Sequence, residues 1–231
     1  MPSWACEVLK WSHFKSGSVI KPSKDRLRVF HYGGWDPFAK GTYDVLALSK
    51  LFPNVDFEIS VDLDHAFIKS VSQSNVNFYP AYSKRLYNAA IKKSHILLYP
   101  IYADGWGVGF DALSLAMPII VYDSYDKAEI VINGETGFLV PVARHLSYLD
   151  SFYTGPYVNW EDYNAYVAAH ANATQVELLA EVLEKYCRCP ESILEHSRNA
   201  SSFFDLHHNP YARIRRIQEI YSEILSTINR M

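Results

Sequence analysis

The sequence predicts an α/β fold built on one doubly wound parallel sheet. Short apolar stretches alternate with stretches of helical periodicity along the first two thirds of the chain. Apolar runs of this kind are typical of strands buried on both faces, and the helices between them form right-handed crossovers. We therefore expect a single Rossmann-like domain over residues 27–231, ending in helices, with residues 1–26 as an N-terminal segment and linker.

The expected strands are short and are separated by turn residues. The runs that predict them are Leu27–Tyr32, Val55–Val61, Val76–Tyr79, His95–Tyr99, Ile119–Tyr122 and Gly137–Val140. Helical spacing lies between them, over Val45–Leu51, Ser83–Lys93, Phe110–Met117 and Lys127–Ile132. Strands that alternate with helices in this way indicate βαβ units around a parallel sheet.

The alternation stops at an aromatic-rich insertion over residues 142–173. This segment is interpreted either as a contact surface for a partner or as a flap that packs on its own domain. Thr174 and Glu177 have the spacing of a capping box at the start of the next helix. The helices expected after the insertion are Thr174–Tyr186, Glu191–Phe204 and Pro210–Ile228.

Composition excludes several classes of protein. The net charge of −3 over 231 residues provides no field that would attract nucleic acid or an anionic membrane. No apolar stretch reaches the ~18 residues of a transmembrane segment, and the N-terminus lacks the apolar run of a signal peptide. Cys6, Cys187 and Cys189 have the spacing of neither a disulfide framework nor a zinc site, so we expect reduced thiols in a cytoplasmic protein.

Two glycine-bearing loops follow strands, where ligands bind in open α/β sheets. The first loop runs from Gly33 and Gly34 to Lys40 and Gly41. Its glycines allow a ligand close to the backbone, the following helix offers free N–H groups, and Lys40 adds a charge suited to phosphate. A plain strand-to-helix turn with a surface lysine would look the same, so this loop alone leaves both interpretations open.

The second loop runs from Asp104 through Gly105, Trp106 and Gly107 to Asp111. Its backbone amides would hold a diphosphate or sugar hydroxyls, and Asp111 at the helix start would accept hydrogen bonds from a ribose diol. The alternative is that the two aspartates cap the loop and the helix. Because glycine-rich turns are common, this loop also leaves both interpretations open.

The run from His95 to Val142 is more specific than either loop. It contains a strand, then D-G-W-G, a helix at Asp111, a P-I-I-V strand, E-I-V, and finally G-E-T-G-F-L-V-P. In order and spacing this run resembles the C-terminal domain of family 4 glycosyltransferases, which have the GT-B fold. The resemblance extends more loosely over residues 20–230, apart from the insertion.

The resemblance implies a retaining, metal-independent transfer of a hexosyl group from a nucleoside-diphosphate sugar, with no cofactor besides that co-substrate. Lys40 would contact the donor diphosphate, Asp104 would lie near the donor sugar, and Asp111 would hold the ribose. The donor site that it implies consists of Gly33, Gly34, Lys40, Gly105, Trp106, Gly107 and Asp111, with Asp104 as the catalytic residue.

The sequence departs from the family pattern within this site. The family has two glutamates where this chain has Asp104 and Asp111, which also stand one residue closer together. Gly34 replaces an arginine, a bidentate ligand for phosphate. These departures favour an alternative, in which the chain is a non-catalytic nucleotide- or sugar-binding subunit of a split glycosyltransferase.

The acceptor side of the reaction is not accounted for. A GT-B enzyme has two Rossmann-like domains, and residues 1–26 are too few for the second one. We expect that half from a partner chain or a homo-oligomer, with an acceptor that the sequence does not identify. Of the remaining polar residues, Asp62 and Asp64 match the D-x-D of metal-dependent glycosyltransferases, a match that is frequent by chance. His31 is interpreted as a hydrogen-bonded strand residue and not as a base.

Overall fold

The computed structural model describes residues 26–103, 105, 107–143, 146, 153–154, 157–170 and 173–228. Six strands in these ranges form one parallel sheet in the order β3-β2-β1-β4-β5-β6. Their bounds are β1 Leu27–Gly34, β2 Val55–Val61, β3 Val76–Tyr79, β4 Ile96–Tyr99, β5 Ile119–Tyr122 and β6 Gly137–Val140. The predicted doubly wound sheet is confirmed, and its strand order reverses between β1 and β4, where ligands bind in such sheets.

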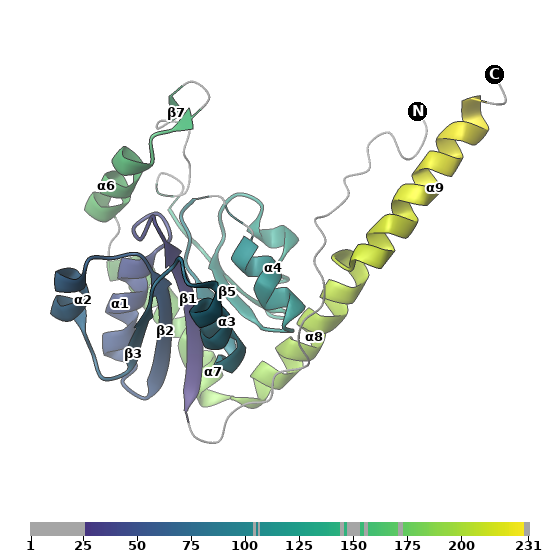
Figure 1. Ribbon diagram of the computed structural model, residues 1–231. Coiled ribbons are helices and arrows are strands. Elements are labelled where there is room, and N and C mark those ends of the chain that lie inside the picture. The colour runs from purple at the N-terminus through teal and green to yellow at the C-terminus, as the bar shows by residue number, and fades with distance from the viewer. Residues whose placement is uncertain are drawn as a thin grey trace.

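Helices cover both faces of the sheet (Figure 1). On one face, α1 (Thr42–Leu51) packs against α7 (Ala173–Arg188). On the other face lie α3 (Lys84–Lys93) and α4 (Gly107–Ser114). The central strands β4 and β5 are buried at every residue, which is the physical reason for their continuous apolar sequences.

The strand predictions agree with the structure more closely than the helix predictions. Gly107 and Gly109 belong to α4 and not to the preceding loop, because the buried residues around them override the low helix propensity of glycine. The predicted helix end at Met117 is wrong, since α4 stops at Ser114 and Ala116 has a positive φ of 56°. The helix predicted from Lys127 to Ile132 is a single 3₁₀ turn, η2 (Lys127–Glu129).

Two local corrections concern helix starts. The chain after β2 forms α2 (His65–Val71), which the sequence analysis did not predict, and the Asp64 carboxylate accepts from Phe67 N at 2.9 Å as its N-cap. Asp64 therefore has a structural role in place of the metal-binding role considered for the D-x-D motif. Thr174 is the second residue of α7 and not its cap, because the helix already begins at Ala173.

The insertion contains secondary structure of its own. A short antiparallel pair, β7 (Tyr153–Thr154) and β8 (Tyr157–Val158), precedes α6 (Trp160–His170). Figure 1 shows α6 beyond the carboxyl end of the sheet, on the side of α1. Tyr163 and Val167 on α6 are almost completely buried, so one face of this helix packs onto the domain.

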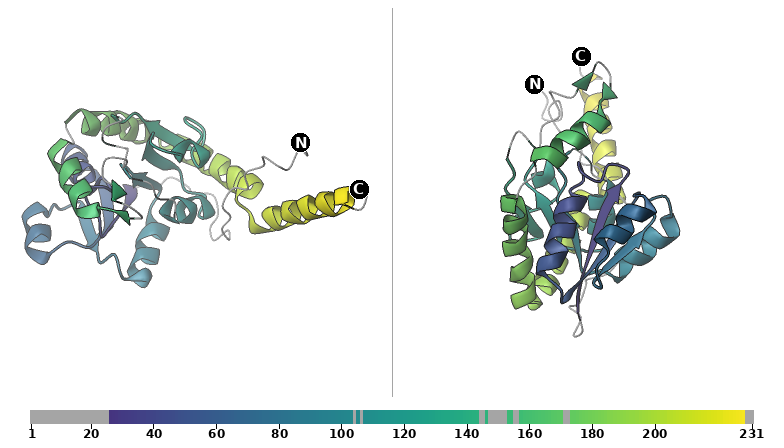
Figure 2. Two further views of the ribbon diagram at one scale, coloured as in Figure 1. Left: turned by 90° about the horizontal axis from the view of Figure 1, so that it is seen from above. Right: turned by 90° about the vertical axis from the view of Figure 1, so that its left-hand side faces the viewer.

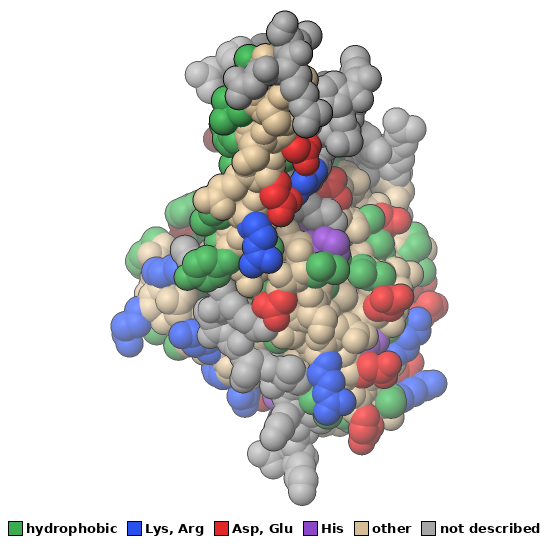
Figure 3. Space-filling model, turned by 90° about the vertical axis from the view of Figure 1, so that its right-hand side faces the viewer, with side chains coloured by type: hydrophobic (Ala, Val, Ile, Leu, Met, Phe, Trp, Pro, Cys, Tyr) green, Lys and Arg blue, Asp and Glu red, His purple; other side chains and the backbone are tan. Residues whose placement is uncertain are grey.

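The chain ends in α8 (Glu191–His207) and α9 (Pro210–Ile228). Both Figure 1 and Figure 2 show α9 extending away from the body, and none of its residues is buried. On the side of the molecule drawn in Figure 3, acidic, basic and hydrophobic side chains are interspersed. In the part of the chain that the structure describes, no helix is long and apolar enough to cross a membrane.

Candidate functional site

The loop between β1 and α1 is held against the end of β4. Within this loop, Lys40 N donates to Asp36 O at 2.9 Å and Gly41 N donates to Phe38 O at 2.8 Å. Gly41 has a φ of +70°, and a Cβ atom there would lie 2.1 Å from the carbonyl oxygen of Pro100. Only glycine fits this position, and the tight turn places Lys40 at the point where the strand order reverses.

Lys40 and Gly105, which come from the two glycine-bearing loops, lie side by side. A Cβ atom built on Gly105 would lie 3.7 Å from Lys40 Nζ and 3.3 Å from the hydroxyl oxygen of Tyr99. Gly105 also has a φ of +154°, which residues with side chains rarely adopt. Glycine thus permits this backbone conformation beside the Lys40 ammonium group, a charge that suits a phosphate or another anion.

A cavity of about 510 Å³ opens over the start of α4, which begins two residues after Gly105. A volume of this size fits a small-molecule ligand, and a largely aromatic lining with a few charged groups is typical of such sites. The lining consists of Tyr32, Trp35, Ala81, Tyr82, Lys84, Tyr87, Gly107, Val108 and Asp111.

Asp111 is the carboxylate of this cavity. Its Oδ2 atom accepts a hydrogen bond from the Tyr87 hydroxyl at 2.7 Å, and Lys84 Nζ lies 3.6 Å from the same oxygen. Burial and the charge of Asp111 raise the pKa of Tyr87, so the hydroxyl stays protonated and remains a donor. The Asp111 side chain is 24% exposed. It is therefore both held in one orientation and accessible from the cavity.

Aromatic packing holds Tyr87, whose hydroxyl group donates the hydrogen bond to Asp111, in place. The Tyr87 ring meets Phe30 and Tyr32 edge to face, with centroids 5.2 and 5.6 Å away, and Lys84 Nζ lies 4.4 Å from its centroid. Tyr82, which is 73% exposed, adds another aromatic side chain to the cavity lining. Exposed rings of this kind suit stacking against a planar ligand.

His31 lies on β1 below the first loop and is fully buried. Its Nδ1 atom is 3.0 Å from the Leu98 carbonyl oxygen, and its Nε2 atom is 2.9 Å from the hydroxyl oxygen of Thr42. Because a carbonyl oxygen only accepts, Nδ1 carries the proton and Nε2 accepts from Thr42. Burial lowers the pKa of His31 to about 4, opposed by the Leu98 bond and assisted by the charge of Lys40. The prediction of a hydrogen-bonded strand histidine is confirmed.

No protein-family profile and no curated protein sequence matches this chain significantly. Solved structures do match it. Sucrose-phosphate synthase from Thermosynechococcus elongatus aligns with a TM-score of 0.61 and 16% identity, over 88% of this chain and 46% of that one. HepE from Anabaena, in complex with UDP and glucose, aligns with a TM-score of 0.60 and 15% identity, over 86% of this chain and 48% of that one.

A third match shows which part of these longer chains is shared. It is the C-terminal domain of a group 1 glycosyltransferase, LpcC, from Francisella tularensis, with a TM-score of 0.56 and 11% identity, over 83% of this chain and 97% of that domain. The chain has the fold of the C-terminal half of a GT-B glycosyltransferase. This GT-B half spans 46% and 48% of the length of the first two matched chains, and at these identities the likeness establishes the fold alone.

The structure brings four of the predicted donor-site residues together in two pairs. Gly107 and Asp111 line the cavity, and Lys40 lies beside Gly105, two residues before Gly107. Asp111 is the fifth residue of α4 and not its first, which corrects the expectation that it begins the helix. Its side chain nevertheless faces the cavity, because positions one turn into the helix still reach the carboxyl edge of the sheet.

Other predicted residues do not reach the cavity or are not described. A Cβ atom on Gly33 would lie 2.3 Å from Thr42 Oγ1, so this glycine allows β1 and α1 to pack closely. Gly34, with a φ of +56°, borders the ring of Tyr32 and does not belong to the cavity lining. Asp104 and Trp106 lie outside the described residues, so their roles stay predictions.

Several residues of the cavity were missed from the sequence. Tyr82, Lys84 and Tyr87 follow β3, whose carboxyl end lies at the same edge of the sheet as those of β1 and β4. The rule that ligands bind beyond the ends of parallel strands applies to them as much as to the glycine loops. The signal was therefore present, but no glycine drew attention to this loop. Among the residues that the structure describes, no group of three or more side chains could hold a metal ion.

Proposed function

We propose that the chain binds a nucleoside-diphosphate sugar at the carboxyl edge of its sheet and is the donor half of a glycosyltransferase. One observation carries this proposal: an oriented carboxylate, Asp111, lines a cavity at the start of α4, and a lysine, Lys40, borders Gly105 two residues before that helix begins. A nucleoside-diphosphate sugar has a ribose diol next to its base and a doubly charged diphosphate between the ribose and the transferred sugar. The two side chains offer one matching group for the diol and one for the diphosphate.

Asp111 is proposed to bind the ribose. A carboxylate accepts hydrogen bonds only, and ribose hydroxyls are donors. Tyr87 and Lys84 hold the Oδ2 atom from one side, which orients the carboxylate toward the cavity. The shorter aspartate, where the related family has glutamate, reaches less far, and we propose that Tyr87 compensates by fixing the carboxylate in place.

The diphosphate is proposed to lie between Lys40 and the start of α4. The first backbone N–H groups of a helix lack partners within the helix, and the helix dipole adds a partial positive charge there. α4 begins at Gly107, two residues beyond the Gly105 that borders Lys40 Nζ. A negative charge that grows on the leaving diphosphate during transfer would be stabilised by this arrangement without a metal ion.

Transfer itself would need an acceptor side. We propose that a second domain, in the same polypeptide or in another, contributes it, since the chain spans about half the length of the first matched enzymes. Retention at the anomeric carbon and a catalytic role for Asp104 remain part of this proposal. A second candidate is a donor-binding subunit without turnover, which the replacement of the family's arginine by Gly34 favours.

The test is calorimetric titration of the purified chain with UDP-, GDP- and ADP-sugars. Lys40→Ala and Asp111→Asn are each expected to weaken binding of the preferred donor by about tenfold or more, since hydrogen bonds to charged groups contribute about 1.5–3 kcal/mol. Lys50→Ala and Asp205→Asn, at exposed positions on α1 and α8, are matched controls that should leave the affinity unchanged. A chelator should also have no effect.

Two results would count against the proposal. Absence of binding to all three donor classes would reject a donor site in this chain. Binding that persists in both Lys40→Ala and Asp111→Asn would place the ligand elsewhere. The two candidate functions separate in a second measurement, because slow release of free sugar from the bound donor, followed by proton NMR, requires turnover and binding alone does not.

A further inference from the structure

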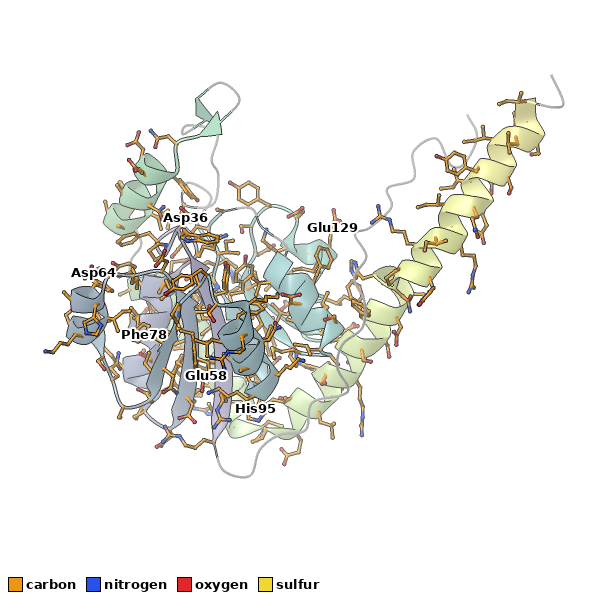
Figure 4. The ribbon with its side chains drawn as sticks, in the orientation of Figure 1. Asp36, Glu58, Asp64, Phe78, His95 and Glu129 are labelled. Carbon is orange, nitrogen blue, oxygen red and sulfur yellow. The ribbon has the colours of Figure 1, made fainter. Side chains whose placement is uncertain are left out.

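The inserted helix α6 contacts both loops of the candidate donor site. Figure 4 shows Asp36, in the first loop, next to α6 at the carboxyl end of the sheet. Asn164 Oδ1 accepts from Ala39 N at 2.9 Å, and Asn164 Nδ2 donates to Asp36 Oδ1 at 3.2 Å. Ala39 is completely buried and immediately precedes Lys40. A side chain from a distant part of the sequence thus satisfies a buried amide beside the proposed phosphate ligand.

The neighbouring residue on α6 reaches the other loop. Tyr163 is fully buried, and its hydroxyl oxygen lies 3.0 Å from the Tyr102 carbonyl oxygen and 2.6 Å from that of Leu146. Both carbonyls only accept, so the hydroxyl proton is shared between them or alternates. Tyr102 lies three residues before Gly105. Adjacent side chains of one helix therefore hold the two backbone segments that lead to Lys40 and to Gly105.

We propose that α6 positions the donor site, with Asn164 fixing the loop of Lys40 and Tyr163 fixing the loop of Gly105. The inference rests on the proposed function and assigns a task to the aromatic-rich insertion. Neither side chain lines the cavity, so both act through the loops and are positioning residues. A lysine held in a fixed loop loses less conformational freedom when it binds phosphate, and this preorganisation strengthens binding.

Hydrogen exchange without nucleotide tests the positioning of the loops. In Asn164→Ala, the amide of Ala39 loses its acceptor, and exchange over residues 37–41 should rise about tenfold. Asn164→Asp keeps an oxygen for that amide but replaces the donor to Asp36 with a second carboxylate oxygen, so most of the protection should return only in the double variant Asp36→Asn, Asn164→Asp, where the amide introduced in the first loop would be the donor. Tyr163→Phe should instead raise exchange mainly near Tyr102, with a smaller rise over residues 37–41, because Tyr102 N donates to Ala39 O at 2.9 Å. Ala165→Ser, on the exposed side of α6, is the control.

Binding measurements test whether the positioning serves the phosphate. Asn164→Ala should weaken binding of the nucleoside diphosphate by about fivefold and binding of the nucleoside by less than twofold, because only the former needs Lys40. If Asn164 acts through Lys40, the double variant with Lys40→Ala should bind no more weakly than Lys40→Ala alone.

Each alternative outcome is distinguishable. Unchanged exchange in Asn164→Ala, or an equal loss for nucleoside and nucleoside diphosphate, would overturn the positioning role and leave α6 as a packed flap. If the unmodified chain binds no nucleotide while exchange in Asn164→Ala still rises, the proposed function fails. In that case α6 holds the two loops in place, but the loops have another function. The inference would also be contradicted if the losses of affinity in Asn164→Ala and Lys40→Ala multiplied in the double variant.

Discussion

Glu58, in the middle of the sheet, and Asp111, at its carboxyl edge, both accept a hydrogen bond from a tyrosine hydroxyl and lie near a lysine. Figure 4 shows Glu58 on the sheet, well away from the end marked by Asp36. Tyr79 donates to Glu58 at 2.6 Å and Lys93 at 2.8 Å, and the side chain is 1% exposed. Asp111 is 24% exposed and faces a cavity.

The two carboxylates differ in how deeply they are buried and in how closely a lysine approaches them. Both oxygens of Glu58 are engaged, because Asn77 Nδ2 and Arg28 Nε lie 3.3 and 3.5 Å from its Oε1 atom. For Lys93, burial lowers the pKa, but the bonds to Glu58 and Tyr79 outweigh it, and the pKa is raised overall. At Asp111, Lys84 Nζ lies 3.6 Å from Oδ2 and is largely exposed. A group compensated on all sides stabilises the fold, whereas an oriented group that faces a cavity can serve a ligand.

The largest expected effect concerns His31, which is buried like Glu58 but carries no charge. Its pKa is about 4 in the folded chain, against 6.5 for the free side chain, so the unfolded state binds a proton first as the pH falls. Stability from this group is complete above pH 6.5 and is lost toward pH 4, by up to about 3 kcal/mol. Urea denaturation at several pH values should show this loss of unfolding free energy toward pH 4 in the unmodified chain and not in His31→Gln. The exposed variant His65→Gln should behave like the unmodified chain.

A smaller effect is expected when the charge of Glu58 is removed. Glu58→Gln leaves Lys93 and Arg28 without their buried partner and should cost about 2 kcal/mol of unfolding free energy, less than a fully buried pair because both cations are partly exposed. Donor affinity should not change. A Glu58→Gln variant with normal stability but impaired nucleotide binding would show that the comparison assigns the two carboxylates wrongly.

The smallest effect on stability is expected at Asp111. Asp111→Asn keeps an oxygen that accepts from Tyr87 and weakens the interaction with Lys84, which solvent screens because Lys84 is largely exposed, so the unfolding free energy should change by about 0.5 kcal/mol or less. Its effect should be on ligand binding alone. Thermal denaturation of the ligand-free variant measures this directly, and a loss as large as that of Glu58→Gln would make Asp111 a structural residue.

The sheet could be predicted from the sequence because its central strands β4 and β5 are continuous apolar runs that are buried at every residue. The predicted bounds of β2, β3, β5 and β6 agree with the structure, since each is a short run rich in apolar residues between turn residues. The insertion could not be predicted in the same way. α6 buries only a narrow set of positions, including Tyr163 and Val167, and this leaves no clear helical period in its sequence.

The candidate site could be predicted in part, because local motifs mark some of its residues and long-range contacts define the others. Lys40 and Asp111 were found because a motif marks them in the chain, and the fold brings their loops to one edge of the sheet. The position of Tyr87 after β3 could be predicted, but its contact with Asp111, across 24 residues of sequence between α3 and α4, could not. Asn164 acts over a separation of 125 residues. Such contacts follow from tertiary packing and leave no local pattern.

A crystal structure of the chain with its best-bound nucleoside diphosphate tests the central claim most directly. The account predicts the ribose within hydrogen-bonding distance of Asp111, the base against the aromatic lining, and the diphosphate between Lys40 Nζ and the start of α4. A nucleotide found elsewhere, or an Asp111–Lys40 edge that stays empty at saturating ligand, would contradict it.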